Sequence, residues 1–114
     1  MNKLSKKIYA IDFDNTLAMT DYPTILAPIQ HMIDYCIDLR KEGHTLILWS
    51  CREGKELYDA VRWCAEHELE FHYVNRNTDE IIKAFGKDPR KIFANYYIDD
   101  RNLIPHLEVS GRGF

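Results

Sequence analysis

Short apolar runs alternate along the chain with longer segments in which apolar residues recur at helical spacing. The short runs are rich in β-branched and aromatic residues and predict buried strands at 8–11, 45–49, 71–74 and 96–98. The helical spacing predicts helices over 26–42 and 54–68, and a short helix that Thr78 caps and Gly86 ends. Asp88-Pro89 predicts one further helical turn.

Strands that are apolar on both faces and alternate with helices are typical of a parallel sheet covered on both sides. We therefore expect an α/β fold with four strands, and a fifth, short edge strand around 107–109. The length of 114 residues is below that of an average domain, and we find no internal repeat or linker. Residues 1–114 are thus expected to form a single domain.

Composition and charge narrow the class of protein. The hydrophobic fraction of 46% and charged fraction of 29% are those of a globular domain. No uninterrupted apolar run exceeds four residues, so we expect no membrane span and no secretion signal. Three cysteines without C-x-x-C spacing favour a reducing compartment, and we expect a cytoplasmic protein. The net charge of −3 disfavours a nucleic-acid coat, although basic residues cluster near both ends of the chain.

Polar residues follow each predicted strand. Asp12 and Asp14 come after the first strand, Ser50 after the second, and Asp99-Asp100 after the last. Ligands of open α/β sheets bind beyond the carboxyl ends of the strands. If the first and last strands are neighbours, their four carboxylates converge, and an all-oxygen site suits Mg2+. Any one of these residues, taken alone, could as well form a turn or cap a helix as belong to a functional site. Their combination at the ends of three strands is what indicates a site.

These residues carry a family resemblance. The segment 11–17, Ile-Asp-Phe-Asp-Asn-Thr-Leu, resembles the first motif of the haloacid dehalogenase-like (HAD) hydrolases, DxDx(T/V). The run 46–50 resembles their second motif, an apolar strand that ends in Ser or Thr, and 97–100 resembles the fourth, which ends in paired Asp. The match extends over about residues 6–102 and implies a Rossmann-like three-layer sandwich with a parallel sheet of four to five strands.

The resemblance also implies a mechanism and roles for single residues. Asp12 would be the nucleophile that forms an aspartyl-phosphate, and Asp14 the general acid and base. Ser50 would bind a phosphoryl oxygen. Asp99, Asp12 and the backbone carbonyl of Asp14 would hold Mg2+, with help from Asp100. Asp14 further indicates a phosphatase, since a leaving alkoxide needs a proton.

The sequence identifies the basic residue of the third motif and the substrate contacts less clearly than the other three motifs. Lys91 lies eight residues before Asp99 and is the favoured third-motif lysine, with Lys83 and Lys87 as alternatives. Its charge would hold the nucleophile and the phosphoryl oxygens. The candidates for substrate contact flank the first two motifs: Asn15, Thr16, Cys51 and Arg52.

The spacing leaves no room for the cap domain that many HAD hydrolases carry, so we expect a capless, open site with a small flap at 17–22. A bulky phosphorylated macromolecule end, or a homo-oligomer around a phosphorylated small molecule, would then exclude water. The predicted function is a magnesium-dependent phosphatase for a phosphate monoester. The alternative is a non-catalytic phosphate-binding or interaction module on the same fold.

Other phosphate-handling classes do not fit the sequence. A receiver domain needs its phosphoacceptor Asp after the third strand, where this chain has Asn75-Arg76-Asn77. A cysteine phosphatase needs C-x5-R, and none of the three cysteines is followed by Arg at that spacing. The chain also contains neither GxxxxGK[ST] nor GxGxxG, which disfavours a P-loop kinase and a dinucleotide-binding protein.

Overall fold

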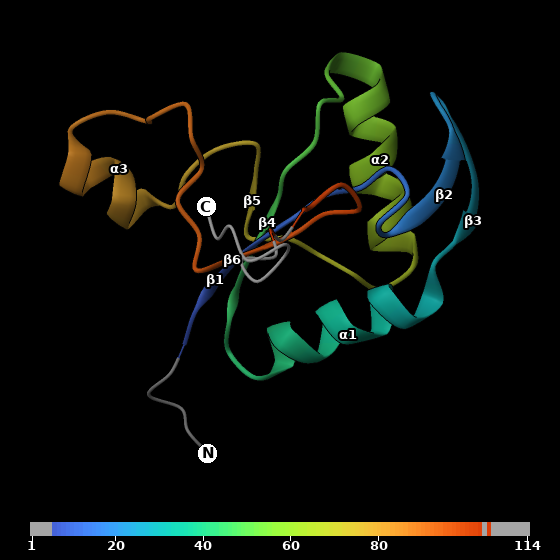
Figure 1. The fold of residues 1–114 in the computed structure, drawn as a ribbon, viewed down its shortest axis with the longest axis horizontal. Coiled ribbons are helices and arrows are strands. Elements are labelled where there is room, and N and C mark those ends of the chain that lie inside the picture. Colours follow the sequence, from blue (N-terminus) through green and yellow to red (C-terminus); the bar gives the residue numbers. More distant parts are fainter. Residues whose placement is uncertain (1–5, 104, 106–114) are drawn as a thin grey trace.

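The apolar runs form a parallel sheet, and the helices lie on its two faces (Figure 1). The computed structural model describes residues 6–103 and 105. The strands are β1 (Ile8–Ile11), β2 (Ala18–Asp21), β3 (Thr24–Pro28), β4 (Thr45–Leu48), β5 (Tyr73–Val74) and β6 (Tyr96–Ile98). The helices are α1 (Gln30–Lys41), α2 (Gly54–Glu66) and α3 (Asp79–Phe85).

Four of the strands make the main sheet in the order β5-β4-β1-β6. All three pairings are parallel, with β1 in the centre between β4 and β6. Ala10 on β1 is opposite Ile47 on β4 and Tyr97 on β6. The first and last predicted strands are therefore neighbours, and their carboxyl ends lie at the same edge.

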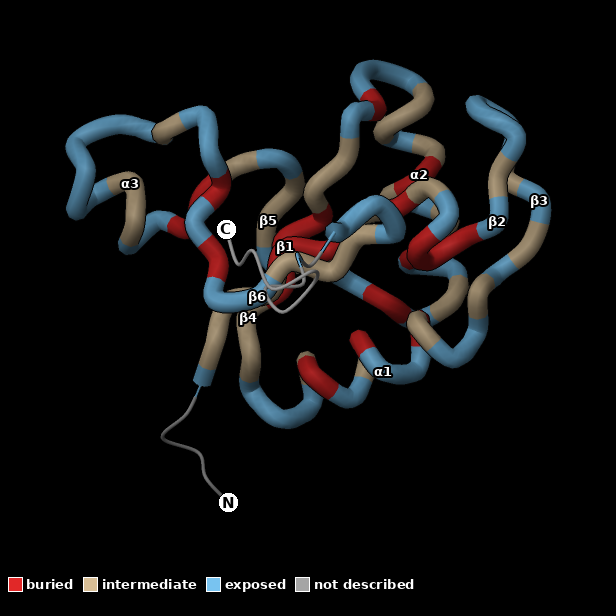
Figure 2. The backbone as a smooth tube through the Cα atoms, in the orientation of Figure 1, coloured by how far each residue is buried: buried red, intermediate tan, exposed pale blue. Residues whose placement is uncertain are grey.

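Each face of the sheet is buried by a different layer. Ile11 and Leu48 belong to a core cluster with residues of α1 and α2, including Ile33 and Cys64, all of them fully buried. A second core cluster lies on the other face of the sheet. It combines strand residues with residues of the segment that precedes β6, and it consists of Ala10, Ile47, Ile92 and Ala94. The buried stretches of the tube in Figure 2 gather accordingly on the sheet and on the inner sides of α1 and α2. The fold is thus the α/β Rossmann-like sandwich that the sequence predicts.

The region between β1 and α1 differs from the prediction. The predicted helix 26–42 begins only at Gln30, and residues 24–28 form β3, which pairs with β2 as an antiparallel hairpin. Leu26 has helical spacing but is 61% exposed on β3. The physical reason is Pro28, which disfavours helical backbone at the residue before it and provides no N–H. The expected flap at 17–22 is thus one strand of a longer hairpin.

The connection from β5 to β6 contains the predicted short helix, α3, but not the helical turn predicted after it. Thr78 caps α3 by accepting a hydrogen bond from the N–H of Ile81, and Gly86 ends it with φ of 79°. The helical turn predicted at Asp88-Pro89 does not form. Instead, Asp88 Oδ1 and the Pro89 carbonyl accept hydrogen bonds from the side chain of Asn77.

The remaining predictions concern the two connections and the chain end. Only the hairpin lies between β1 and α1, and only α3 lies between β5 and β6, so neither connection holds a cap domain. The fifth strand predicted at 107–109 lies outside the described residues. No helix in the part of the chain that the structure describes is long and apolar enough to cross a membrane.

Candidate functional site

Three carboxylates meet at the carboxyl edge of the sheet. Asp12 directly follows β1, and Asp99 and Asp100 directly follow β6. The N–H of Asp12 donates to the carbonyl of Ile98 (2.9 Å), which extends the β1–β6 ladder into the site. One oxygen from each carboxylate lies within 4.8 Å of the others. The parallel pairing of β1 and β6 therefore brings together three of the four predicted acidic residues.

Burial, together with the neighbouring carboxylates, perturbs the ionisation of Asp12. Burial and the charges of Asp99 and Asp100 raise the pKa of Asp12 from 3.8 to about 6. A hydrogen bond from the Thr16 hydroxyl (3.0 Å) opposes this shift without cancelling it. Like charges held this close are stabilised by a cation, and carboxylate oxygens suit a hard divalent ion. The donor set therefore fits Mg2+.

Asp14 lies apart from the triad. Both of its carboxylate oxygens accept hydrogen bonds from Arg52, at 2.9 Å from Nε to Oδ2 and 2.8 Å from Nη2 to Oδ1. The Thr20 hydroxyl adds a third at 2.8 Å. Burial tends to raise the pKa of Asp14, but the bonds from Arg52 and Thr20 outweigh it and leave the pKa below 3.8. The carboxylate predicted as the general acid and base is thus held ionised, with its oxygens directed to Arg52.

Arg52 is the largest fully buried side chain of the described residues, at 1% exposure. Its guanidinium lies over the rings of Phe13 and Tyr22, each at 5.0 Å, and also donates to the carbonyls of Glu56 and Pro23 (3.2 Å each). The sequence predicts a substrate contact for this residue, but the structure places it inside the protein. There it joins β1, the hairpin and the start of α2.

Ser50 lies after β4, where its backbone N–H is held by a residue of the loop that follows β5. Its N–H donates to the side-chain oxygen of Asn75 (2.8 Å), and its hydroxyl accepts from the N–H of Arg52 (3.0 Å). Asn75 has φ of 52°, a left-handed conformation that Asn tolerates. Asn75 therefore positions Ser50, a function that its place in a loop did not reveal.

Three predicted substrate contacts have different surroundings. Thr16 is buried and bonded to Asp12, whereas Cys51 is exposed and follows Ser50. Asn15 has φ of 61°, and its side-chain oxygen accepts from the N–H of Thr20 (3.2 Å). Asn15 thus stabilises the turn that leads into the hairpin.

The three candidate third-motif lysines lie on the α3 side of the sheet. The Nζ of Lys91 is 5.8 Å from the centre of the Tyr97 ring, and Tyr97 is two residues before Asp99 on the same chain segment. Lys83 lies on α3 and Lys87 just after it, and both are exposed. Lys91 therefore lies against the strand that precedes Asp99, and its assignment as the third-motif lysine stays a prediction.

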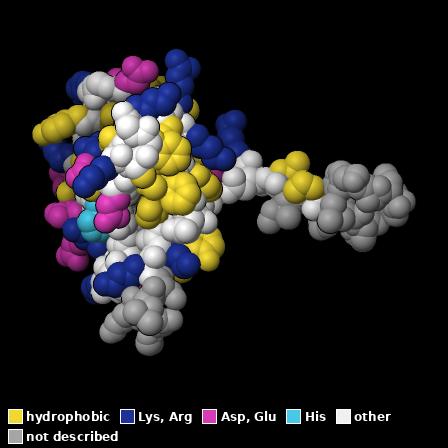
Figure 3. Space-filling view, turned by 90° about the vertical axis from the view of Figure 1, so that its left-hand side faces the viewer, with side chains coloured by type: hydrophobic (Ala, Val, Ile, Leu, Met, Phe, Trp, Pro, Cys, Tyr) yellow, Lys and Arg dark blue, Asp and Glu magenta, His cyan; other side chains and the backbone are white. Residues whose placement is uncertain are grey.

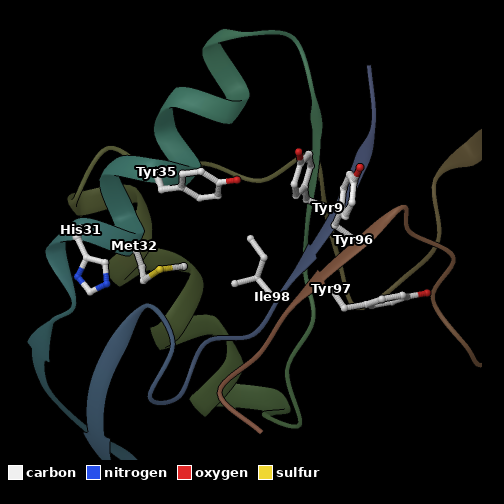
Figure 4. Close-up of a pocket in the computed structure, with 7 residues that line it drawn as sticks. All are labelled: Tyr9, His31, Met32, Tyr35, Tyr96, Tyr97 and Ile98. Carbon is white, nitrogen blue, oxygen red and sulfur yellow. The ribbon is translucent and has the colours of Figure 1, made fainter. Parts of the chain in front are cut away.

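A groove of about 730 Å³ lies on the other side of β6, against α1 (Figure 4). It is lined by Tyr9, His31, Met32, Tyr35, Tyr96, Tyr97 and Ile98. None of the predicted catalytic residues lines it, so the groove and the acidic triad are separate features.

Comparison with known proteins places the chain beside a solved structure. No family model matches the sequence, and no curated protein sequence matches it. The structure described as that of the conserved protein coded by locus from Bacteroides thetaiotaomicron is 38% identical, with a TM-score of 0.77. The match covers 90% of this chain and 84% of the other. Because identity and fold agree over most of both chains, this protein belongs to the same family as that conserved Bacteroides thetaiotaomicron protein.

Proposed function

We propose that the protein is a magnesium-dependent phosphatase that hydrolyses a phosphate monoester. The observation that supports this most directly is the triad of Asp12, Asp99 and Asp100, which converges at the carboxyl ends of β1 and β6. The three motifs that resemble those of HAD hydrolases lie at the ends of β1, β4 and β6. An open site with no cap domain suits a phosphorylated macromolecule end or a small substrate enclosed by a second subunit.

Mg2+ held by the triad would neutralise the carboxylates and the charge of the phosphoryl group. Asp12 then attacks phosphorus through a carboxylate oxygen, the ester P–O bond breaks, and Asp14 gives its proton to the leaving oxygen. In the second step water attacks the same phosphorus, the bond from phosphorus to Asp12 breaks, and Asp14 takes the proton of the water. Ser50 and Lys91 bind the phosphoryl oxygens.

The role of Asp14 requires a rearrangement. Its carboxylate is bound to Arg52, and a general acid must carry a proton and contact the leaving oxygen. Asp14 therefore has to leave Arg52 when substrate binds. The same contact favours a second candidate function, a phosphate-binding module without hydrolysis, in which Asp14 and Arg52 remain paired.

Phosphate release separates the two candidates. Wild-type protein would be incubated with p-nitrophenyl phosphate and a panel of phosphorylated metabolites and oligonucleotides, with Mg2+ or with chelator. A phosphatase releases phosphate only with Mg2+, and Asp12→Asn abolishes the release. Binding of inorganic phosphate without release from any substrate would support the binding module, and release that survives Asp12→Asn would contradict the proposed mechanism.

A further inference from the structure

The segment 83–93, which runs from the end of α3 toward β6, combines basic and aromatic side chains. Its basic residues are Lys83, Lys87, Arg90 and Lys91, and its one acidic residue is Asp88. Phe85 is 59% exposed and Phe93 is 43% exposed. Figure 3 views the protein from the α3 side and shows a hydrophobic patch with Lys and Arg side chains along its border and acidic side chains at one edge. The excess of basic residues in the segment 83–93 contrasts with the net charge of −3 of the whole chain.

The charges of this segment are available to a ligand. None of its four basic side chains forms an ion pair with a residue that the structure describes. Asp88 is occupied, because its Oδ1 accepts from the side chain and the N–H of Asn77. The exposed cations of α2 differ, since Lys55 pairs with Asp59 and Arg62 with Glu66.

The segment has a fixed shape although much of it has no regular secondary structure. Asn77 is fully buried, and its side-chain nitrogen also donates to the carbonyls of Pro89 (3.0 Å) and Lys91 (3.4 Å). Its side-chain oxygen accepts from the N–H of Phe93 (2.6 Å). The hydroxyl of Tyr97 on β6 donates to the carbonyl of Ile92 (2.6 Å). The basic segment is thus attached to the strand that provides Asp99.

Exposed aromatic rings between basic side chains match the two chemical features of a single nucleic-acid strand. The backbone presents a phosphate at each nucleotide, which basic side chains bind, and unpaired bases stack on exposed aromatic rings. We propose that the 83–93 segment binds single-stranded nucleic acid and directs a phosphorylated end of the strand to the acidic triad. This rests on the proposed function and names its substrate class. In the reaction, the terminal ester P–O bond breaks, and water supplies an oxygen to the phosphate and a proton to the hydroxyl left on the strand.

The test measures binding separately from hydrolysis. A fluorescein-labelled oligothymidylate of about 12 nucleotides, a length typical of such surfaces, would carry no terminal phosphate. Its fluorescence anisotropy would be titrated with wild-type protein in EDTA at several salt concentrations. We expect saturable binding that weakens steeply with salt. No binding at low salt would overturn the proposal.

Two sets of variants locate the surface. Lys87→Gln combined with Arg90→Gln should reduce the slope of log affinity against log salt by about 1.4, or about 0.7 for each lost phosphate contact. Lys41→Gln combined with Arg62→Gln removes the same charge from exposed positions on α1 and α2 and should leave the slope unchanged. Equal effects of the two pairs would mean that binding follows net charge, which overturns the proposal.

A second pair of variants tests whether bases stack on the exposed aromatic rings of the segment. Phe85→Ala should weaken binding at least about fivefold, since base stacking on an aromatic ring contributes at least that much. Tyr58→Ala on α2 removes a ring of similar exposure (62%) and should have no effect. An abasic strand of the same length that binds as tightly as the oligothymidylate would show charge attraction alone and would contradict the proposal.

The failure of this inference is distinguishable from the failure of the proposed function. Release of phosphate from p-nitrophenyl phosphate by a protein that does not bind the oligonucleotide leaves a phosphatase with a different substrate. Binding that depends on Phe85 and Arg90, without phosphate release from any ester, supports the surface and contradicts the phosphatase.

Discussion

Asp12 belongs to the acidic triad, and its carboxylate lowers the stability of the fold at neutral pH. Its pKa is about 6 in the folded protein and near 3.8 when unfolded, so the folded state binds more protons between these values. The contribution of Asp12 to stability is therefore full below about pH 4 and is lost as the pH rises to about 6. We expect Asp12→Asn to raise the free energy of unfolding at pH 7 by about 1–2 kcal/mol, measured by urea unfolding in EDTA.

The pH dependence provides the control for this prediction. At pH 4 the wild-type protein and Asp12→Asn should have nearly equal stability, because Asp12 is then protonated in the folded state. Asp38→Asn removes an exposed carboxylate of α1 and should change stability little at either pH. A destabilising effect of Asp12→Asn at pH 7 would contradict the raised pKa of Asp12 in the folded protein.

Arg52 acts as a structural residue whose removal would leave several groups unpaired. Arg52→Ala removes both bonds to Asp14 and those to the carbonyls of Glu56 and Pro23. We expect a loss of about 3 kcal/mol or more in the free energy of unfolding, as is typical when one partner of a buried ion pair is removed. Arg62→Ala breaks an exposed pair with Glu66 and should cost less than about 1 kcal/mol in the same urea titration. Equal losses in the two variants would mean that the buried pair contributes no more than a surface pair.

Asn77 organises the connection between α3 and β6. Asn77→Ala removes the side-chain hydrogen bonds that Asn77 makes to four residues of the loop. Among them is the bond that the N–H of Phe93 donates, so this N–H loses its acceptor. We expect a loss of about 2–3 kcal/mol in stability, and amide hydrogen exchange at Phe93 at least about tenfold faster than in the wild type. Amides within β4 are the internal control, since they should change only by the global loss of stability. Unchanged protection at Phe93 would show that other contacts hold the loop.

The elements that the sequence predicts correctly are those whose pattern is local. The runs that became β1, β4 and β6 are short, apolar and bounded by polar residues, and α3 has both its cap and its terminating glycine. The apolar pattern does not predict the hairpin, because Leu26 and Ile29 continue the helical spacing of α1 toward its N-terminus. Pro28 was the available signal, and its restriction of the preceding residue outweighs the apolar spacing.

Within the site, too, the contacts that follow from strand order could be predicted, whereas those that depend on packing could not. Asp12, Asp99 and Asp100 could be predicted to meet, because carboxyl ends of parallel strands share an edge. The pairing of Asp14 with Arg52 could not, because the two residues are 38 positions apart and the contact depends on how the hairpin packs on α2. No local pattern distinguishes a buried loop arginine from a solvated one.

At the scale of the whole molecule, the triad joins the carboxyl ends of two neighbouring strands, the inner strand β1 and the edge strand β6. Because Asp12 follows β1 and Asp99 follows β6, a ligand held by both residues would stabilise the pairing of β1 with β6. A ligand that binds only the folded state stabilises the entire fold. Mg2+ binding should therefore be measurable as thermal stability, without any substrate.

Stabilisation by Mg2+ tests the proposed site independently of its reaction. At about ten times its dissociation constant, Mg2+ should add about 1.4 kcal/mol to the stability of the wild-type protein, which raises the melting temperature by about 5 °C. Asp99→Asn should lose most of this shift, because one ligand of the triad becomes neutral and the attraction for a hard cation falls with it. NaCl at the same ionic strength controls for screening of the like charges. If NaCl reproduced the shift, or Asp99→Asn retained it, the triad would be an acidic cluster without a specific cation, and the support for metal-dependent phosphate chemistry would be lost.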